Sequence, residues 1–503
     1  MSGIWYDICS GVISTCFLTV LFILALWHNL ISWFHKKDPR DIRGSKSAIK
    51  PRRELRRRSS SVNSETPFAL TEFDEANNIE YDHTVTSGEA VGKDELPRTR
   101  SSEGGNPFAD LLMAEDFRLV PRLGYYYEQY DLDFESFEVT TEDGFVIELW
   151  HLRSKSAGDK SSDKSDRHPV LLLHGLLQSS GSFASSGRKS LAYYLEEQGF
   201  DVWLGNNRCG FKPKWAHIEK DAHWDWDLKE MVKYDLPALV DEVLVKAGKP
   251  KISLVAHSQG TTQVFMGLVN GEALYDGSFR LIDKIENFVA LAPAVYPGPL
   301  LDEKGFIRFM SRYVAKPWAF GRGSFLPLMS VMRKLMVGSK LFSFLSYVMF
   351  NYLFDWNDTL WDKPLRDRHF LFSPVVISVK LMRWWLGDGR NAPCFKNFAE
   401  TTFPDSKTWF PVQSGPPKIQ IENHLNIPRP TVTDFPRFLI FIPRQDRLVD
   451  GERLINHFID HESHSLYKIW YIDEYSHLDV LWARDVVQRI GKPMVDNLRI
   501  PTL

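Results

Sequence analysis

Cysteine is scarce in this chain, with four residues among 503. The positions of Cys9, Cys16, Cys209 and Cys394 match neither a disulfide framework nor the ligand spacing of a metal site. This scarcity excludes the small disulfide-rich secreted folds and the zinc-binding modules. We therefore expect no metal site built from these cysteines, and a globular part that resides in a reducing compartment.

Charge is absent over residues 8–35, which contain no Asp, Glu, Lys or Arg. Residues 11–34 are long and apolar enough to cross a bilayer. A cleaved signal peptide fits poorly, because residues 1–7 have no basic side chain and no small-residue cleavage site follows. A buried core helix is the other alternative, and it is uncommon at this length. We therefore predict an N-terminal membrane anchor over residues 1–35, either transmembrane or monotopic.

Acidic residues are few directly after this segment, since residues 36–58 carry eleven Lys or Arg against three Asp or Glu. On the other side of the apolar stretch, Asp7 is the only charged side chain. The positive-inside rule relates such an excess of basic residues to the cytosolic side of a membrane. We therefore expect the bulk of the chain to lie in the cytosol.

Apolar periodicity is missing from residues 36–115, which are rich in Arg, Ser, Glu and Gly. We predict a disordered linker whose basic part lies on an anionic membrane surface. The serine clusters at 59–61 and 101–102 follow arginines and are candidate phosphorylation sites. Phosphorylation there would weaken the electrostatic attraction to the membrane. The alternative is that both clusters are only solvated linker.

From residue 116 onward the chain alternates short apolar strands with amphipathic helices. This order predicts one α/β domain over residues 116–503 with a mostly parallel central sheet. The predicted strands are residues 137–140 and 145–151, which form a hairpin, and then 170–173, 202–204, 252–255, 288–291, 438–442 and 467–472. The predicted helices between them are residues 191–198, 229–247 and 261–270.

The alternation stops near residue 297 and resumes only at the strand predicted for 438–442. The residues between, about 297–432, contain apolar stretches typical of helices at 326–335, 342–353 and 375–386. An insertion at this point lies where a cap would cover the strand ends. We therefore predict a large helical cap. Its many aromatic, Leu and Met side chains either form its own core or suit a lid that opens at a lipid surface.

One short motif indicates a nucleophile. Residues 252–255 are a β-branched apolar run typical of a buried strand, and residues 261–270 follow as a helix. Between them, Ala256-His-Ser258-Gln-Gly260 resembles the nucleophile elbow of the α/β-hydrolases, with Ala256 in place of the first glycine. Small residues are needed because strand and helix approach closely there. The alternative is that this short pattern occurs by chance, but a strand before it and a helix after it favour a true elbow. We therefore predict Ser258 as the nucleophile.

A serine nucleophile needs a base within hydrogen-bond reach and a carboxylate that orients the base. In the α/β-hydrolases the acid and then the histidine follow the serine along the chain, on loops after strands. Asp446 comes four residues after the strand predicted for 438–442, and His477 comes five residues after 467–472. Both are expected at the sheet edge that carries Ser258. We predict Asp446 as the orienting acid and His477 as the general base and acid.

Other acidic and histidine residues lie nearby in the sequence but fit these roles less well. Asp450 is expected to begin a helix, and Asp434 precedes its strand and so lies at the wrong end. His457, His461 and His464 belong to that helix or to its exit, where we expect solvated side chains.

The tetrahedral intermediate of acyl transfer needs two backbone N–H donors. We predict that Gln259, directly after the nucleophile, supplies one of them. The loop after the strand at 170–173 supplies the other, from the N–H of Leu176. His257, beside the nucleophile, is expected to be a packed neutral histidine that shapes the turn.

From about residue 115 to its end, the chain resembles the acid lipase and steryl ester hydrolase family. The motifs that carry the resemblance are Thr141-Glu-Asp-Gly144, Leu172-Leu-His-Gly-Leu-Leu177, Trp203-Leu-Gly-Asn-Asn-Arg208, the stretch from Trp224 to Pro237, His257-Ser-Gln-Gly260 and Ser476-His-Leu-Asp479. The N-terminal anchor and Lys380-Leu-Met-Arg-Trp-Trp385 are similar to the membrane-anchored fungal branch. Cys209 interrupts the usual Asn-x-Arg-Gly, so we expect a different local turn there.

The resemblance implies an α/β-hydrolase fold and a serine hydrolase that cleaves steryl esters into sterol and fatty acid in lipid catabolism. Such a reaction needs no metal and no redox cofactor, and we expect none. A triacylglycerol lipase is one alternative. A catalytically inactive lipid-binding protein on the same scaffold is another, and the intact Ser258, Asp446 and His477 argue against it. The expected partners are the lipid substrate and a membrane or lipid-droplet surface, with no nucleic acid. The expected location is the lipid droplet or the endoplasmic reticulum membrane, with the plasma membrane as the alternative.

Overall fold

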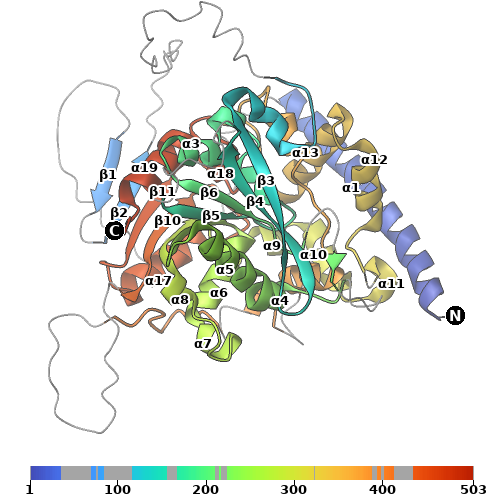
Figure 1. Ribbon diagram of the computed structural model, residues 1–503. Coiled ribbons are helices and arrows are strands. Elements are labelled where there is room, and N and C mark those ends of the chain that lie inside the picture. The colour runs from blue at the N-terminus through green and yellow to red at the C-terminus, as the bar shows by residue number, and fades with distance from the viewer. Residues whose placement is uncertain are drawn as a thin grey trace, which may run out of the picture.

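A single large sheet forms the centre of the molecule (Figure 1). The computed structural model describes residues 2–35, 70–74, 77–83, 116–155, 167–209, 214–216, 224–321, 323–387, 393–397, 402–412 and 434–501. Within these residues eleven strands are ordered β1-β2-β11-β10-β9-β8-β5-β6-β4-β3, and β7 pairs with β4. All pairings from β2 to β6 are parallel, whereas β1, β3, β4 and β7 pair antiparallel at the edges. The predicted mostly parallel sheet is therefore confirmed.

The central strands are the most deeply buried part of the chain. The strands are β1 (Leu70–Asp74), β2 (Ile79–His83), β3 (Leu132–Thr140), β4 (Phe145–Ser154), β5 (Pro169–Leu173), β6 (Asp201–Gly205), β7 (Lys214–Trp215), β8 (Ile252–His257), β9 (Ile285–Leu291), β10 (Arg437–Pro443) and β11 (Tyr467–Ile472). Every residue of β5 and β8 is buried. A strand of a parallel sheet has helices on both of its faces, which explains why these strands are nearly continuous apolar runs in the sequence.

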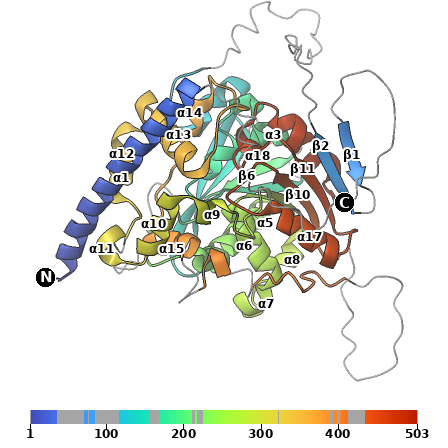
Figure 2. The ribbon, with the colours of Figure 1, turned by 180° about the vertical axis from the view of Figure 1, so that it is seen from behind.

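Helices cover both faces of the sheet (Figures 1 and 2). They are α3 (Leu191–Glu197), α4 (Leu228–Glu230), α5 (Leu236–Ala247), α6 (Gln259–Val269), α7 (Gly271–Leu274), α8 (Leu281–Lys284), α17 (Gly451–His461), α18 (Asp479–Trp482) and α19 (Lys492–Asn497). The sheet and these helices are called the body below. The helices predicted after the strands are present, with α4 joined to α5 by a π-helical turn, Met231–Asp235.

Two strands lie inside the segment predicted to be a disordered linker, residues 36–115. β1 and β2 form an antiparallel pair, and β2 adds in parallel to β11. Ile79 is fully buried, and Arg489 Nε donates to Asp82 Oδ2 over 2.7 Å. The prediction is wrong for these strands, because the hairpin is stabilised by a sheet edge built from the far end of the chain. Both predicted serine clusters lie outside the described residues.

A set of helices lies between β9 and β10 in the chain, where the cap was predicted. They are α9 (Leu300–Glu303), α10 (Gly305–Tyr313), α11 (Pro317–Phe320), α12 (Pro327–Met336), α13 (Lys340–Phe354), α14 (Arg366–His369) and α15 (Val379–Leu386), called the cap below. The helix predicted over 375–386 begins later, at Val379. The cause is Ser378, whose hydroxyl accepts a hydrogen bond from the N–H of Leu381 over 2.9 Å and so caps the helix.

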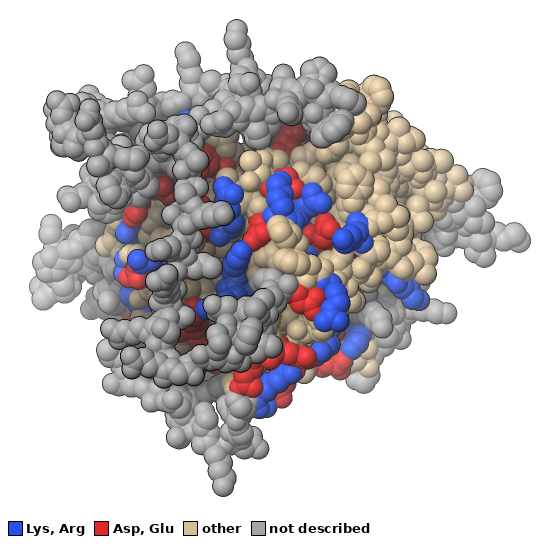
Figure 3. Space-filling view, turned by 90° about the horizontal axis from the view of Figure 1, so that it is seen from above, with Lys and Arg blue, Asp and Glu red and all other residues tan. Residues whose placement is uncertain are grey.

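The N-terminal apolar segment is one long helix, α1 (Ser2–His35), which runs along the cap (Figure 2). Its stretch Cys9–Ile31 has a mean hydropathy of 2.3 and is long and apolar enough to cross a membrane. About a third of that stretch is buried against the rest of the protein (33%). Figure 3 shows a broad area without charged residues on the side of the molecule that carries α1. The sequence prediction of an apolar anchor-like helix is therefore confirmed. The contact of this helix with the cap was not predicted.

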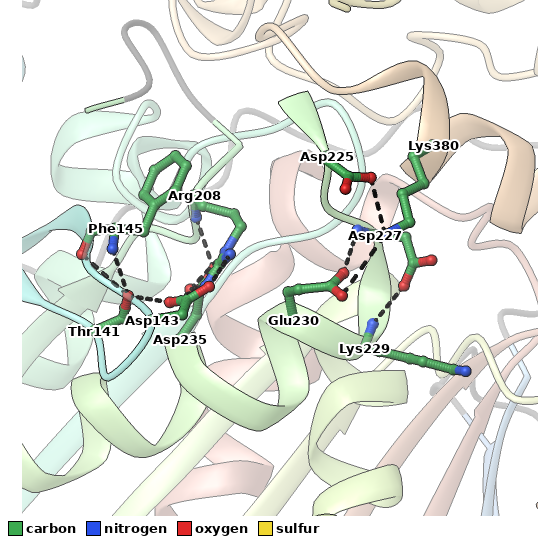
Figure 4. Close-up of polar contacts among 10 residues, drawn as sticks. All are labelled: Thr141, Asp143, Phe145, Arg208, Asp225, Asp227, Lys229, Glu230, Asp235 and Lys380. Atoms are coloured by element: carbon green, nitrogen blue, oxygen red, sulfur yellow. Dashed lines mark hydrogen bonds and ion pairs between the residues drawn. The ribbon is translucent and has the colours of Figure 1, made fainter. Parts of the chain in front are cut away.

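Three of the sequence motifs meet in one buried ion-pair network (Figure 4). Arg208, which follows β6, has no exposed side-chain surface and lies between two carboxylates. Its Nη1 donates to Asp143 Oδ2 over 2.8 Å, and its Nε donates to Asp235 Oδ1 over 2.9 Å. Asp143 belongs to the turn between β3 and β4, and Asp235 to the helical turn before α5. These motifs connect three segments of the body that are distant in sequence.

Cys209 follows this arginine and is buried. The residues directly after it, 210–213, lie outside the described part of the chain. The different local turn expected at Cys209 therefore stays a prediction.

Candidate active site

Ser258 stands on the turn that joins β8 to α6. Its backbone has φ 52° and ψ −119°, a conformation that residues with a side chain rarely adopt. Such strain persists only where the surrounding structure holds it in place, here a fully buried strand on one side and a buried helix on the other. The turn projects the hydroxyl away from the strand, as the elbow motif predicts.

Small residues beside the nucleophile have a direct structural reason. A Cβ atom on Gly260 would lie 2.8 Å from the carbonyl oxygen of Leu173 and 2.9 Å from that of His174, so only glycine fits. Ala256 pairs in register with Leu173 on one side and Ala290 on the other. The sheet therefore accepts alanine where the motif usually has glycine.

A chain of two hydrogen bonds links the three residues predicted to carry out the chemistry. His477 Nε2 lies 2.8 Å from Ser258 Oγ, and His477 Nδ1 lies 2.6 Å from Asp446 Oδ2. Since the carboxylate can only accept, Nδ1 carries the proton and Nε2 is left to accept the hydroxyl proton of the serine. The residues follow the ends of β8, β10 and β11, which lie close together in the parallel sheet, with β9 between β8 and β10. The order of the strands thus brings together side chains separated by about two hundred residues of chain.

Asp446 is held by the backbone as well as by the histidine. Its Oδ1 accepts hydrogen bonds from the N–H groups of Leu448, over 2.9 Å, and Val449, over 3.4 Å. The side chains of Asp446 and His477 are each 2% exposed. A buried carboxylate with both oxygens hydrogen-bonded can fix the orientation of the imidazole and stabilise its positive charge.

His257 is the packed neutral histidine expected from the sequence. Its Nδ1 lies 2.9 Å from Gln178 Oε1, and its Nε2 lies 3.1 Å from the carbonyl oxygen of His477. Burial lowers the pKa of His257 well below its usual value, and the neighbouring His477 lowers it further. The ring therefore stays neutral and supports the loop that carries His477.

The two predicted oxyanion donors lie on either side of the serine. A Cβ atom on Gly175 would lie 2.9 Å from Ser258 Cβ, so the loop after β5 passes directly over the nucleophile. Leu176 follows on that loop, and Gln259 is the first residue of α6. Among the described residues, neither N–H donates to another protein group. Both are therefore available to a ligand oxygen next to Ser258.

An apolar cavity under the cap opens onto the serine and the histidine. It encloses about 1090 Å³ when the open space at its mouth is counted. Its lining from the cap includes Ile307, Met310, Phe325, Met329, Phe350 and Met382. A cavity lined almost entirely by apolar side chains suits an apolar ligand.

Trp356 of the cap stacks on His477, with ring centroids 5.3 Å apart and an angle of 7° between the rings. The indole covers one face of the imidazole and restricts its rotation. In addition, Trp385 Nε1 of α15 donates to Gln259 Oε1 over 2.8 Å, which ties the cap to the residue after the nucleophile.

The alternative acid and base candidates lie elsewhere. The Asp450 side chain accepts from the N–H of Arg453 over 2.9 Å and caps α17, as predicted. Asp434 precedes β10, at the opposite end of the strand from Asp446. His464 is exposed and His461 half-buried.

His457 is buried, so the prediction of a solvated side chain is wrong there. Its ring stacks on Trp409 at 3.6 Å, and its Nε2 lies 3.2 Å from Glu462 Oε1. The reason is that the segment 402–412, which contains Trp409 and belongs to the predicted cap region of the sequence, covers this side of α17.

Several side chains around the site were not identified from the sequence, namely Gln178, Trp356, Trp385 and, on α1, Phe17 and Leu21. Trp385 belongs to the Lys380–Trp385 motif, but nothing in the sequence relates it to the site, and no motif marks Gln178 or Trp356. Each reaches the site from a segment remote in sequence from Ser258. On α1 the buried residues recur at the helical period, at Ser10, Ser14, Phe17, Leu18, Leu21 and Ala25. The exposed face also carries hydroxyls, at Thr15 and Thr19, so no signal in the sequence marks which face packs on protein.

Comparison with known proteins agrees with this fold. The profile described as "Partial alpha/beta-hydrolase lipase region" matches residues 123–187, and that described as "alpha/beta hydrolase fold" matches residues 168–295. Sterol esterase 2 of Saccharomyces cerevisiae is 57% identical over 98% of this chain and 97% of that protein. Human lysosomal acid lipase/cholesteryl ester hydrolase is 28% identical over 73% of this chain and 87% of its own length. Rat gastric triacylglycerol lipase is 32% identical over 44% of this chain and 52% of its own length.

Proposed function

The chain belongs to the lipase family of the α/β hydrolases, and from this premise we propose that it is a membrane-anchored sterol esterase, which releases a sterol and a fatty acid from a steryl ester. One observation carries the proposal. In the Ser258–His477–Asp446 hydrogen-bond chain, Ser258 and His477 line an apolar cavity under the cap. The name of the relative that matches over nearly the whole chain supports the same substrate class.

In the proposed reaction His477 Nε2 takes the proton of Ser258 as Oγ attacks the ester carbonyl carbon. Asp446 stabilises the resulting imidazolium, and the N–H groups of Leu176 and Gln259 hold the oxyanion. The C–O bond to the sterol then breaks, and His477 gives its proton to the leaving sterol oxygen. Water, deprotonated by His477, attacks the acyl-enzyme in the same way and releases the fatty acid and the free serine.

The apolar helix α1 supports the proposal of a membrane anchor, transmembrane or monotopic, over residues 1–35. We assign residues 36–115, apart from β1 and β2, to a linker, residues 116–503 to the hydrolase domain and residues 297–432 to its cap. The basic residues after α1 favour a cytosolic catalytic domain at a lipid droplet or the endoplasmic reticulum, with the plasma membrane as the alternative. Glycosylation of the sequon at Asn357 would contradict this orientation.

The direct test is hydrolysis of labelled steryl esters and triacylglycerols by the purified full-length protein and by Ser258→Ala. We expect steryl ester hydrolysis by the wild type and a loss of about 10⁶-fold in the variant, since the serine acts together with the other two residues. Preferential turnover of triacylglycerol would favour the lipase alternative. Equal activity of variant and wild type would contradict the serine mechanism.

A further inference from the structure

The long N-terminal helix has two different faces. On one face Leu18 and Leu21 are each 1% exposed, although both side chains would be equally stable in lipid. On the other face Ile23 and Trp27 are about 60% exposed (60% and 62%). An anchor that only had to sit in a bilayer would need no such protein-covered face. The buried face therefore has a structural partner, which is the cap.

The contact between α1 and the cap is specific in shape. The Phe17 ring lies 4.5 Å from that of Phe306 and 5.2 Å from that of Phe320, centroid to centroid. At the other end of the contact, a Cβ atom on Gly321 would lie only 3.3 Å from Ser10 Oγ. Lipid tails are as apolar as these side chains, so the gain from the contact comes from close packing and not from removal of water.

Two residues of the buried face of α1 extend past the cap surface into the cavity of the site. Phe17 and Leu21 line the same cavity as Ser258 and His477. Leu18, which is adjacent on the helix and equally buried, lines a neighbouring small hollow between α1, α12 and α13 instead, on the other side of Met329 and Met349. The helix thus closes one side of the cavity under the cap with two particular side chains.

We propose that Phe17 and Leu21 are substrate-binding residues that contact the apolar part of the ester away from the scissile bond. The inference rests on the esterase function proposed above and deepens it. The helix that holds the protein at a lipid surface then also forms a wall of its active site, and the site is incomplete without it. The exposed face of α1 lies against lipid while the opposite face contacts the ester, so substrate passes from lipid into the cavity beside the helix.

The helix itself provides matched variants for the test. Leu21→Ala removes a side chain from the cavity wall, and Leu21→Trp adds volume at the same place. Leu18→Ala removes an equally buried leucine that faces the other hollow, and Leu24→Ala removes a leucine that is 39% exposed. Each full-length variant is assayed in detergent micelles with cholesteryl oleate and with p-nitrophenyl butyrate, whose short chain is held mainly at the serine.

We expect both Leu21 variants to lower kcat/KM for cholesteryl oleate by about tenfold or more while kcat/KM for the butyrate ester changes by less than about twofold. The ratio of the two values should stay at the wild-type level in Leu18→Ala and Leu24→Ala. Butyrate hydrolysis also reports that each variant is folded, and either Leu21 variant is sufficient for the test.

A wild-type ratio in both Leu21 variants would overturn the inference, and so would an equal change of the ratio in Leu18→Ala. Ser258→Ala separates this result from the proposed function. If that variant keeps its activity towards the butyrate ester, the serine mechanism fails whatever the Leu21 variants do. If it is inactive and the Leu21 ratio is unchanged, only the role of α1 fails.

Discussion

The body around the site and the contact between the cap and α1 depend on different kinds of interaction. The body buries charged and polar groups in fixed geometry, as in the Arg208–Asp235 pair and the His477–Asp446 pair. The cap and α1 meet through aromatic and aliphatic side chains, as in the tilted contact between the rings of Phe17 and Phe306. Directional hydrogen bonds fix atoms to within fractions of an ångström, which proton transfer needs, whereas apolar packing is adaptable in shape, which a large flexible substrate needs. The proposed reaction therefore depends on groups of the body, and we expect the choice of substrate to depend on the cap and α1.

The largest expected effect concerns the orienting carboxylate of the body. Asp446→Asn should lower kcat by about 10⁴-fold, because an amide in that place favours the wrong tautomer of His477. The measurement is the rate of hydrolysis of a soluble short-chain ester, which occupies little of the cavity under the cap. Asp450→Asn is the control, since that side chain only caps α17. Similar losses in both variants would contradict the assignment of Asp446.

Two ion pairs, one inside the body and one between the body and the cap, should contribute differently to the free energy of unfolding. Arg208→Ala leaves the buried Asp235 without its partner and should lower the free energy of unfolding by about 3–5 kcal/mol. Lys380 of α15 lies 3.3 Å from Asp225 and 3.7 Å from Glu230, but it is 40% exposed (Figure 4). Lys380→Ala should therefore cost less than about 1 kcal/mol. Denaturant unfolding measures the free energy of unfolding of both variants. Equal losses would contradict the expected difference between the two ion pairs.

Buried histidines should make the protein sensitive to acid. Burial lowers the pKa of His168 to about 4, that of His174 to about 4 and that of His369 to about 3. Between pH 6.5 and about 4 the unfolded chain binds protons that the folded chain does not, so stability falls as the pH falls. Each histidine contributes about 1.4 kcal/mol per pH unit within that window.

His168→Gln tests this slope, because His168 lies outside the site and its Nε2 only meets Ser253 Oγ, over 2.8 Å. Unfolding free energies between pH 7 and 4 should decrease less steeply in this variant, by about 1.4 kcal/mol per unit. His464→Gln, at an exposed position, should keep the wild-type slope. An unchanged slope in His168→Gln would show that this histidine takes up its proton over the same pH range in the folded and the unfolded chain.

The smallest effect concerns the hydrogen bond that joins cap and body at the nucleophile. Trp385→Phe keeps the aromatic ring but removes the donor to Gln259 Oε1, at a cost of about 1 kcal/mol, which corresponds to about a fivefold lower kcat/KM for the long-chain ester. Trp470→Phe is the matched control, since among the described residues that buried indole N–H has no partner. Equal effects would mean that the bond to Gln259 contributes nothing beyond packing.

Much of the body could be predicted from local sequence patterns. The apolar runs identified the central strands, because strands buried on both faces have no polar positions. The site could be predicted in outline for the same reason, since Ser258, Asp446 and His477 each come a few residues after such a strand. Parallel strands end at a common edge, so position relative to a strand end translates directly into position in space.

The surroundings of the site could not be predicted in this way. Gln178, Trp356 and Trp385 contact it from separate segments, and no local pattern relates them to Ser258. The linker prediction was wrong at β1 and β2 for a similar reason, because their stability depends on β11, nearly four hundred residues further along the chain.

By itself the sequence determined the parallel sheet, the candidate triad and an apolar N-terminal helix, because each depends on residues close together in the chain or on the order of the strands. Tertiary structure alone decided that α1 packs on the cap and that Phe17 and Leu21 face the cavity while Leu18 does not. An apolar helix is equally stable against lipid and against protein, so its composition cannot select between them. The selection comes from the shape of the cap surface that it meets.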